Sequence, residues 1–239
     1  TCYGDGHRHG VAMLLKAVQY LGYFPYDLQQ VPEVVRTFIA HQLQLLWDHT
    51  PDYPWQSRTH DRHLALIRQH TGFRFPTGQD KQELERWLRT YGALDAPTEE
   101  DLRECAYARL RSLGIELPAR HELHRIVQAA LRGFFQDVYD RVAVRLSASV
   151  RTALDALLVV SSEETQSMFD QLKAEPAAPG VKHLQHEVTK LHTLRRLALP
   201  AEALTDVPFK VLQLFKRRAH NEDASRMRAH PAPIRYTLL

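Results

Sequence analysis

The stretch from residue 58 to residue 73, RTHDRHLALIRQHTGF, gathers three arginines, three histidines and one aspartate within a segment of helical periodicity. Side chains of these types can hold a metal ion, transfer protons in catalysis, or contact a negatively charged surface. The direction in which a helix points each side chain decides among these three kinds of site.

Placed at about 100° per residue, this segment has two opposite faces. One face carries His60, Leu64, Ile67 and Thr71, and the other carries Arg58, Arg62, Ala65 and Gln69. Arginine can pair with guanine or clamp phosphate, glutamine can pair with adenine, and a small alanine lets the backbone approach a groove floor. We therefore predict that Arg58, Arg62 and Gln69 contact DNA from one recognition helix. A solvated face with ordinary arginines is the alternative interpretation.

The histidines of the same helix do not predict a metal site. A zinc ion needs three or four ligands in a tetrahedral array, but Ile67 interrupts the row of His60, His63 and His70. The HDxH spacing also differs from HExxH, which brings two ring nitrogens and a base together. We expect His60 to be a hydrogen-bonded core residue, with His63 and His70 as supporting residues that could tune phosphate contacts at low pH.

A second segment has a similar design. Residues 102–135 are predicted to form a helix, a short turn framed by Gly114 and Pro118, and a second helix. The outward face of that second helix carries His121, Arg125, Gln128 and Arg132, which we predict to contact DNA. Two helix-turn-helix-like units in tandem would span consecutive stretches of one DNA face.

The C-terminal part of the chain is basic. Residues 181–239 hold 11 Lys and Arg against 5 Asp and Glu, whereas the net formal charge of the whole chain is only +3. Lys216, Arg217 and Arg218 are candidates for phosphate contact, with a solvated face as the alternative. The apolar stripe within 181–198 is expected to be core or a contact between helices, and comprises Leu184, Val188, Leu191 and Ala198.

Helical periodicity extends over almost the whole chain, and strand signals are nearly absent. Helices are predicted over residues 9–21, 32–46, 58–71, 79–91, 99–113, 118–146, 148–158, 163–173, 181–198, 208–219 and 221–229. We predict an all-α fold with a DNA-binding domain over 1–95, a second over 96–175, and a basic helical unit over 181–239.

Composition and motifs exclude several classes of protein. With 44% hydrophobic and 25% charged residues, the chain can build cores and is not expected to be disordered. No apolar run approaches the roughly 18 residues of a membrane span, and no signal peptide is visible. Two cysteines, Cys2 and Cys105, form no disulfide framework, which fits a reducing cytoplasm. No GxGxxG, GxxxxGK[ST] or GxSxG motif occurs, so no catalytic residue is predicted.

The order of five sequence patterns carries a family resemblance. Residues 9–25 (HGVAMLLKAVQYLGYFP) join a helix to a Phe-Pro step, and residues 31–43 (VPEVVRTFIAHQL) follow with a Val-Pro pattern. An Arg-Thr helix ending in Ile-Arg-x-x-x-Gly-Phe comes next, carried by Arg58, Thr59, His63, Ile67, Arg68, Gly72 and Phe73. With residues 115–130 and the closing HPAPIRYTLL, this order resembles the N-terminal region of replicative transposases of the Tn-three family.

The resemblance implies tandem helical domains that bind double-stranded DNA at the terminal inverted repeats of a transposon. The strand-transfer chemistry of that family belongs to an RNase-H-like domain with an acidic triad, which would lie beyond residue 239. We therefore expect this chain to be a non-enzymatic piece of a longer bacterial protein, cytoplasmic and nucleoid-associated when bound to DNA. No cofactor, membrane or small-molecule substrate is expected, and self-association of the full-length protein is left open.

Three alternatives remain at this stage. The helices could form a protein-interaction or oligomerisation module, in which the same arginines meet acidic protein surfaces. The chain could also be a stand-alone transposase relic that acts as a DNA-binding regulator. A histidine-based metal enzyme is the third alternative, which stoichiometric zinc in the purified protein would support.

Overall fold

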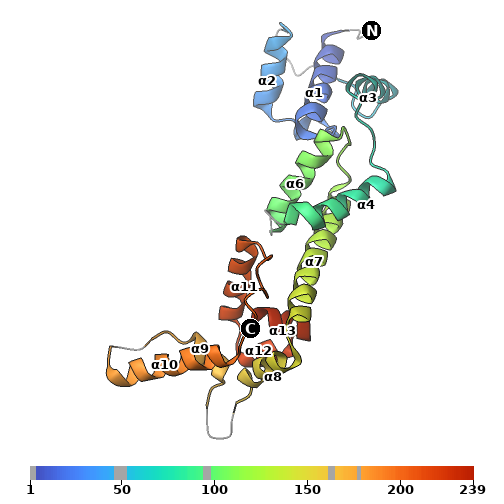
Figure 1. The fold of residues 1–239 in the computed structure, drawn as a ribbon. Coiled ribbons are helices and arrows are strands. Elements are labelled where there is room, and N and C mark those ends of the chain that lie inside the picture. Colours follow the sequence, from blue (N-terminus) through green and yellow to red (C-terminus); the bar gives the residue numbers. More distant parts are fainter. Residues whose placement is uncertain (1–3, 46–52, 94–97, 161–164, 177–178) are drawn as a thin grey trace. The chain divides into compact units, whose positions relative to one another are not determined.

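The computed structural model describes residues 4–45, 53–93, 98–160, 165–176 and 179–239 (Figure 1). Helices dominate these residues, and the only β-type pairing among them is an isolated parallel bridge between Arg74 and Ile115. The predicted all-α fold class is therefore confirmed. No helix in the described parts of the chain has the length and apolar character needed to cross a membrane.

Most helices lie close to their predicted ranges. The elements are α1 (Asp5–Leu21), η1 (Leu28–Gln30), α2 (Glu33–Gln42), α3 (Arg58–Thr71), α4 (Gly78–Trp87), η2 (Leu88–Gly92), α6 (Glu99–Ser112), α7 (Arg120–Arg145), α8 (Ala148–Leu157), α9 (Met168–Lys173), α10 (Val181–Arg196), α11 (Phe209–Asn221), α12 (Ala224–Ala229) and α13 (Ala232–Leu238). Helix α13 was not predicted. The prediction of a helix from residue 163 begins outside the described residues, and α9 itself begins at Met168.

Local capping explains why α3 matches its predicted range. The side chain of Ser57 accepts a hydrogen bond from the backbone N–H of His60, which caps the N-terminus of the helix. Gly72 adopts a left-handed conformation with φ of 76° and ends the helix, because a residue without a Cβ atom adopts this geometry at little cost. Thr98 caps α6 in the same way, with the Asp101 N–H as donor.

The described chain forms two compact units. The first comprises residues 1–92 and 98–130, and the second comprises residues 93–97 and 131–239. Helix α7 begins in the first unit and ends in the second. The three predicted domains have other boundaries, and the division into separately acting DNA-binding domains stays a prediction. Residues 94–97, around the predicted boundary between the first and second domains, lie outside the described residues.

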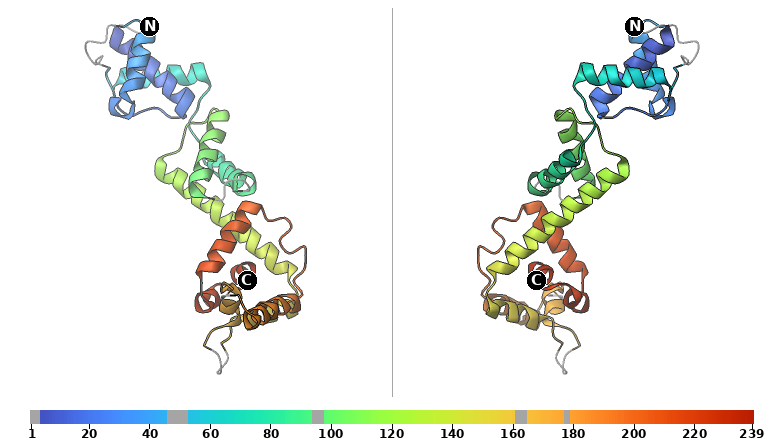
Figure 2. Two further views of the ribbon diagram at one scale, coloured as in Figure 1. Left: turned by 90° about the vertical axis from the view of Figure 1, so that its left-hand side faces the viewer. Right: turned by 90° about the vertical axis from the view of Figure 1, so that its right-hand side faces the viewer.

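In the first unit, α1 packs against both α2 and α3 (Figure 2). One apolar cluster is formed by Leu14, Val18, Tyr53 and Ile67, and a second by Met13, Val31 and Ile39. The helical spacing of the α1 residues places them toward α2 on one flank and toward α3 on the other. The buried face of α3 is therefore part of the core that α1 organises.

An ion pair ties α3 to the segment between α6 and α7. The guanidinium of Arg68 donates to both carboxylate oxygens of Glu116, at 2.5 and 3.1 Å, and the Glu116 side chain is only 8% exposed. The same guanidinium lies 4.0 Å from the ring centroid of Phe75 and 5.0 Å from that of Phe24. The backbone N–H of Glu116 donates to the carbonyl of Arg74, at 2.9 Å. This network holds the turn that precedes α7.

The second unit packs the later part of α7 against α8 and α11 to α13. Aromatic rings join α7 to α11, since the ring of Phe215 lies 5.3 Å from Tyr139 and 5.9 Å from Phe135 between centroids. Asp155 of α8 accepts hydrogen bonds from Arg235 and from the hydroxyl of Tyr236, at 2.8 and 2.9 Å. The unpredicted helix α13 is thus held by polar contacts with α8.

The apolar stripe of α10 is not part of a core. Leu184, Val188 and Leu191 are 65%, 42% and 54% exposed, and Ala198 is exposed beyond the end of the helix. Of the two alternatives expected for these residues, a place in the core is therefore wrong, and a contact between helices stays a prediction. The helix turns a different side toward its own unit, where Lys190 and Leu197 are buried.

Replacing Arg68 by alanine is expected to destabilise the first unit by about 3 kcal/mol or more, because Glu116 would remain buried without its partner. Chemical denaturation monitored by circular dichroism measures this change. Substitution of the exposed Arg86 of α4 is the matched control and should alter stability by less than about 0.5 kcal/mol. The combined replacement Arg68→Met with Glu116→Leu should recover part of the lost stability. If Arg68→Ala were as stable as wild type, the ion pair would not stabilise the first unit.

Candidate nucleic-acid interface

The predicted recognition face of α3 is exposed. Arg58, Arg62 and Gln69 are all exposed, and among the described residues none of the three has a hydrogen bond or ion pair. On the opposite side, His60 and Ile67 are buried, as the helical phasing predicts. Two arginines and an amide are therefore available to an external partner on a helix whose other face is fixed.

Aromatic residues before α3 hold its buried face. The hydroxyl of Tyr53 is hydrogen-bonded to Nδ1 of His63 at 2.9 Å, and the Tyr53 ring stacks on the His63 ring at 5.8 Å between centroids. The rings of Trp55 and His60 lie 5.5 Å apart. Gly10 of α1 makes room for this arrangement, because a Cβ atom there would lie 2.1 Å from Tyr53. The phasing did not identify Tyr53 or Gly10 as determinants of this helix.

Two of the three histidines of α3 are packing residues in the structure. His60 and His63 are each 7% exposed, so His63 cannot tune phosphate contacts as predicted, whereas His70 is exposed. Burial lowers the pKa of both His60 and His63, and nearby His7 and His60 lower that of His63 further. Within the described ranges, no three His, Cys, Asp or Glu side chains are grouped to hold a metal ion.

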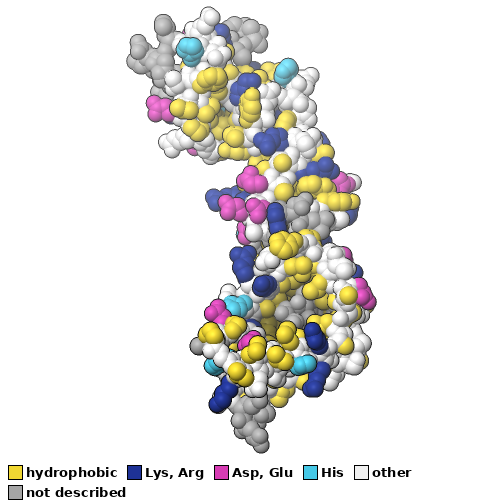
Figure 3. Space-filling model, turned by 60° about the vertical axis from the view of Figure 1, so that its left-hand side comes forward, with side chains coloured by type: hydrophobic (Ala, Val, Ile, Leu, Met, Phe, Trp, Pro, Cys, Tyr) yellow, Lys and Arg dark blue, Asp and Glu magenta, His cyan; other side chains and the backbone are white. Residues whose placement is uncertain are grey.

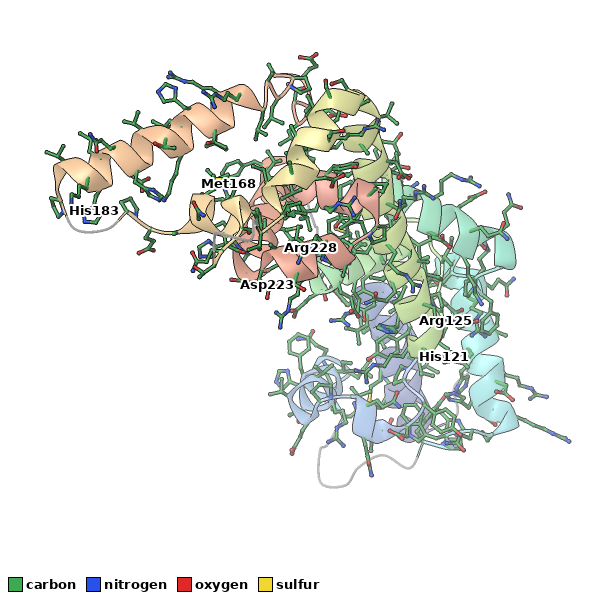
Figure 4. All side chains as sticks on the ribbon, turned by 90° about the horizontal axis from the view of Figure 1, so that it is seen from below. His121, Arg125, Met168, His183, Asp223 and Arg228 are labelled. Carbon is green, nitrogen blue, oxygen red and sulfur yellow. The ribbon has the colours of Figure 1, made fainter. Side chains whose placement is uncertain are left out.

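The start of α7 presents the second predicted face. His121 and Arg125 are exposed (Figure 4), and Arg132 is exposed two turns further along. Gln128 is half-buried and donates to the carboxylate of Glu99, which is also bonded to Nδ1 of His124 at 2.9 Å. The amide of Gln128 is therefore engaged within the protein, and His121 and Arg125 are the more accessible members of the predicted set.

A cleft of about 980 Å³ lies beside this face, between α6 and the start of α7. Its lining includes Tyr23, Glu99, Arg103, Tyr107, Leu117, Pro118, Arg120, His121, Leu123 and His124. Arg103 and Arg120 were not singled out from the sequence, because they belong to neither outward face on helical phasing alone. Glu99 in the same lining is bonded to His124 and pairs with Arg103, so Arg120 and His121 are the basic side chains of this cleft that are suited to a phosphate contact.

The C-terminal basic cluster splits into accessible and structural residues. Lys216 and Arg217 are exposed on α11, whereas Arg218 is half-buried and donates to Glu222 at 2.9 Å. Glu222 is also bonded to His230. Burial alone would raise the pKa of Glu222, but the hydrogen bonds from Arg218 and His230 hold it below its usual range. On the face shown in Figure 3, Lys and Arg side chains occupy separate sites interspersed with acidic and hydrophobic ones.

The first unit coincides with a recognised domain. The family described as a domain of unknown function, DUF4158, matches residues 1–130, and the first unit also ends at Ala130. The match covers more than half of the chain, which therefore belongs to this family.

Curated relatives of the chain are transposases. It is 25% identical over 232 residues to the transposase for transposon gamma-delta from Escherichia coli (strain K12), covering 94% of this chain and 23% of the relative. The transposase for transposon Tn501 from Pseudomonas aeruginosa is 25% identical over 82% of this chain and 20% of the relative. The transposase for transposon Tn1546 from Enterococcus faecium is 22% identical over 98% of this chain and 24% of the relative.

The predicted resemblance to the N-terminal region of a Tn-three-family transposase is thus confirmed. The chain spans a quarter or less of the length of the curated relatives it matches. The role of each predicted DNA-contacting residue stays a prediction.

The stability of the first unit is expected to fall as the pH drops below 6.5. Burial lowers the pKa of His9, His60 and His63 in the folded chain, so the unfolded chain takes up protons first. The stabilisation by these neutral rings is fully present above pH 6.5 and is lost progressively below it. Denaturation at a series of pH values measures this slope. His63→Gln should reduce it, the exposed His70→Gln should not, and a slope identical in both variants would contradict the assignment.

Arg218 and its neighbour Arg217 should differ in their effect on stability. Arg218→Ala removes a partner of the half-buried Glu222 and is expected to cost about 1–2 kcal/mol, since hydrogen bonds to charged groups contribute at this level. Arg217→Ala is expected to stay within about 0.5 kcal/mol of wild type, as is usual for an exposed side chain. Thermal and chemical denaturation of the two variants side by side measure this difference in stability. Equal losses of stability in both variants would contradict the structural role of Arg218.

Proposed function

We propose that this chain is the DNA-binding part of a transposase and binds double-stranded DNA through α3 and the start of α7. The observation that carries the proposal is the free face of α3. Arg58, Arg62 and Gln69 are exposed and have no partner among the described residues, while the core fixes the opposite side of the helix. A polar helix face held by its core is suited to entering a major groove.

Each part of this face has a chemical task. The guanidinium groups of Arg58 and Arg62 can bind guanine edges or phosphate oxygens in a bidentate manner. The amide of Gln69 can donate to and accept from adenine. Ala65 lies between them and keeps the centre of the face low enough for close approach. A helix of this kind would read sequence, with phosphate contacts fixing its register.

The start of α7 would supply a second set of contacts. His121 and Arg125 are exposed there, and the neighbouring cleft adds Arg120, whereas Arg103 is paired with Glu99. The segment from α6 through α7 would act as a helix-turn-helix-like unit, with α7 as its second helix. In the second unit, Lys216 and Arg217 would contact phosphate. Gln128 and Arg218 have intramolecular partners and would position neighbouring side chains.

The natural target would be the terminal inverted repeats of the transposon that encodes the protein. This part of the proposal is supported by the named relatives, each of which is a transposase for a particular transposon. The chain would be the non-catalytic portion of the full-length protein, with strand-transfer chemistry in a domain beyond the matched quarter. No cofactor is proposed for residues 1–239.

Duplex binding is expected to depend steeply on salt, with the logarithm of the binding constant falling linearly against the logarithm of salt concentration. The probe is a duplex of the terminal repeat that flanks the gene, and a shuffled duplex of equal length gives the non-specific level. If Arg62 or Arg125 contacts a base, its replacement by alanine should cost about 1–3 kcal/mol of binding free energy and weaken the preference for the terminal repeat. If it contacts phosphate, the replacement should reduce the slope of the logarithm of the binding constant against the logarithm of salt concentration by about one. Fluorescence anisotropy at several salt concentrations measures both quantities.

Arg86→Ala is the matched control, because it removes another exposed arginine from α4, a helix that carries none of the proposed contact residues. It should bind like wild type. Unchanged binding by both Arg62→Ala and Arg125→Ala would refute the assigned faces. Weak binding with no salt dependence and no preference for the terminal repeat would instead favour a protein-interaction module.

A further inference from the structure

A groove between α1 and α2 presents apolar surface that the proposed DNA-binding function does not use. The two helices lie side by side in the first unit (Figure 1), and two hollows of about 260 and 460 Å³ run between them. The hollows adjoin, because both are lined by Lys16, Tyr20 and Val35. The floor of this α1/α2 groove is formed by members of one buried apolar cluster, Met13, Val31 and Ile39.

Large apolar side chains of the lining are open to solvent. Tyr20 of α1 and Phe38 of α2 are 66% and 64% exposed, and Leu21 and Val35 are 48% and 38% exposed. A contiguous apolar surface of this kind marks an interaction site more often than scattered apolar residues do. Aromatic side chains also carry a large share of the binding energy at interfaces. The α1/α2 groove therefore has the composition of a protein-binding site.

Lys16 gives the groove a single positive charge. Among the residues that line the two hollows, it is the only one with a charged side chain. Its ammonium donates to Oε1 of Gln19 at 3.3 Å and lies 5.8 Å from the ring centroid of Tyr20, and both of these partners are neutral. A partner that covered Lys16 with apolar atoms alone would remove the ammonium from water without compensation. The groove therefore favours a partner with a carboxylate at this point.

The form of the groove suits a helix. Its lining on α1 extends from Ala12 to Leu21, which at 1.5 Å per residue is about 14 Å, or between two and three helical turns. Both walls are helices whose backbone groups are bonded within the helix, so neither wall offers an edge to which a strand could be added. An amphipathic helix instead places apolar side chains at i, i+4 and i+7 into such a groove.

We propose that the α1/α2 groove binds an amphipathic helix of a partner protein, with its apolar side in the groove and a carboxylate against Lys16. The same groove of a second copy is a poor occupant. Lys16 belongs to both hollows, so a two-fold contact between identical grooves would bring two ammonium groups together. Duplex DNA is a poor occupant as well, because one cation in an apolar lining cannot neutralise a run of phosphates.

Selection from a displayed peptide library tests this binding without DNA, so that its outcome does not depend on the proposed function. The library consists of helices of about 16 residues with leucine fixed at i, i+4, i+7 and i+11, and with Ala, Gln, Glu or Lys elsewhere. The 239-residue chain is the target. Enriched peptides should carry a glutamate beside the leucines and, once synthesised, bind with a dissociation constant of about 1–100 µM. A library without any enriched peptide would overturn the proposal.

Replacement of Phe38 locates the binding surface. Phe38→Ala removes an exposed ring from the groove and should weaken binding of the enriched peptide about tenfold or more. Phe209→Ala is the matched control, because Phe209 is 73% exposed on α11 of the second unit, and it should bind like wild type. Circular dichroism should show the wild-type fold for both variants, since both side chains are exposed. Equal affinities of Phe38→Ala and wild type would place the peptide elsewhere and overturn the proposal.

An exchange of charge tests the role of Lys16. Lys16→Glu should weaken binding of the glutamate peptide about threefold or more, and a peptide with lysine in place of that glutamate should regain the lost affinity for Lys16→Glu. General apolar adhesion would not produce this reciprocal effect. Equal affinity of wild type for the glutamate and lysine peptides would overturn the proposal. Dimerisation of the chain that Phe38→Ala abolishes would overturn it as well, because a second copy would then be the occupant.

Discussion

The ion pair between Arg68 and Glu116 is the interaction on which the first unit depends. It joins residues 48 positions apart in the sequence, and the Arg68 guanidinium lies over the rings of Phe24 and Phe75. A charge buried this far needs its partner, because an unpaired buried carboxylate is strongly unfavourable. The pair therefore fixes the end of α3 against the turn that leads into α7. Both helices with exposed candidate faces are in this way held by one network within the domain of the DUF4158 family.

The arginines of this chain are of two kinds, those paired with a carboxylate of the same chain and those without such a partner among the described residues. Arg68, Arg218 and Arg235 are engaged with Glu116, Glu222 and Asp155, and each joins or closes parts of its unit. Arg58, Arg62 and Arg217 have no such partner among the described residues. Because an engaged guanidinium would have to break its own ion pair before binding phosphate, only the second kind is suited to an external ligand. The proposed DNA contacts therefore rest on a minority of the basic residues.

The histidine-rich composition of α3 has a structural explanation. His60 and His63 pack with Tyr53 and Trp55, and burial keeps both rings neutral at physiological pH. Neutral imidazole can then serve as an aromatic core residue with one hydrogen bond, as His63 does with Tyr53. This packing also explains why Gly10 faces this cluster, since no larger residue fits beside Tyr53.

The sequence by itself determined most of the helices and the two faces of α3. Periodicity, Ser57 and Gly72 are local signals, so the range of α3, the exposure of Arg58, Arg62 and Gln69, and the all-α class could all be predicted. Partners could not be predicted in this way, because pairing joins residues distant along the chain. Only the tertiary structure decided that Glu99 engages Gln128, that His63 is buried against Tyr53, and that the stripe of α10 faces outward. Helical phase specifies the direction of a side chain, whereas the packing of other elements determines what it meets there.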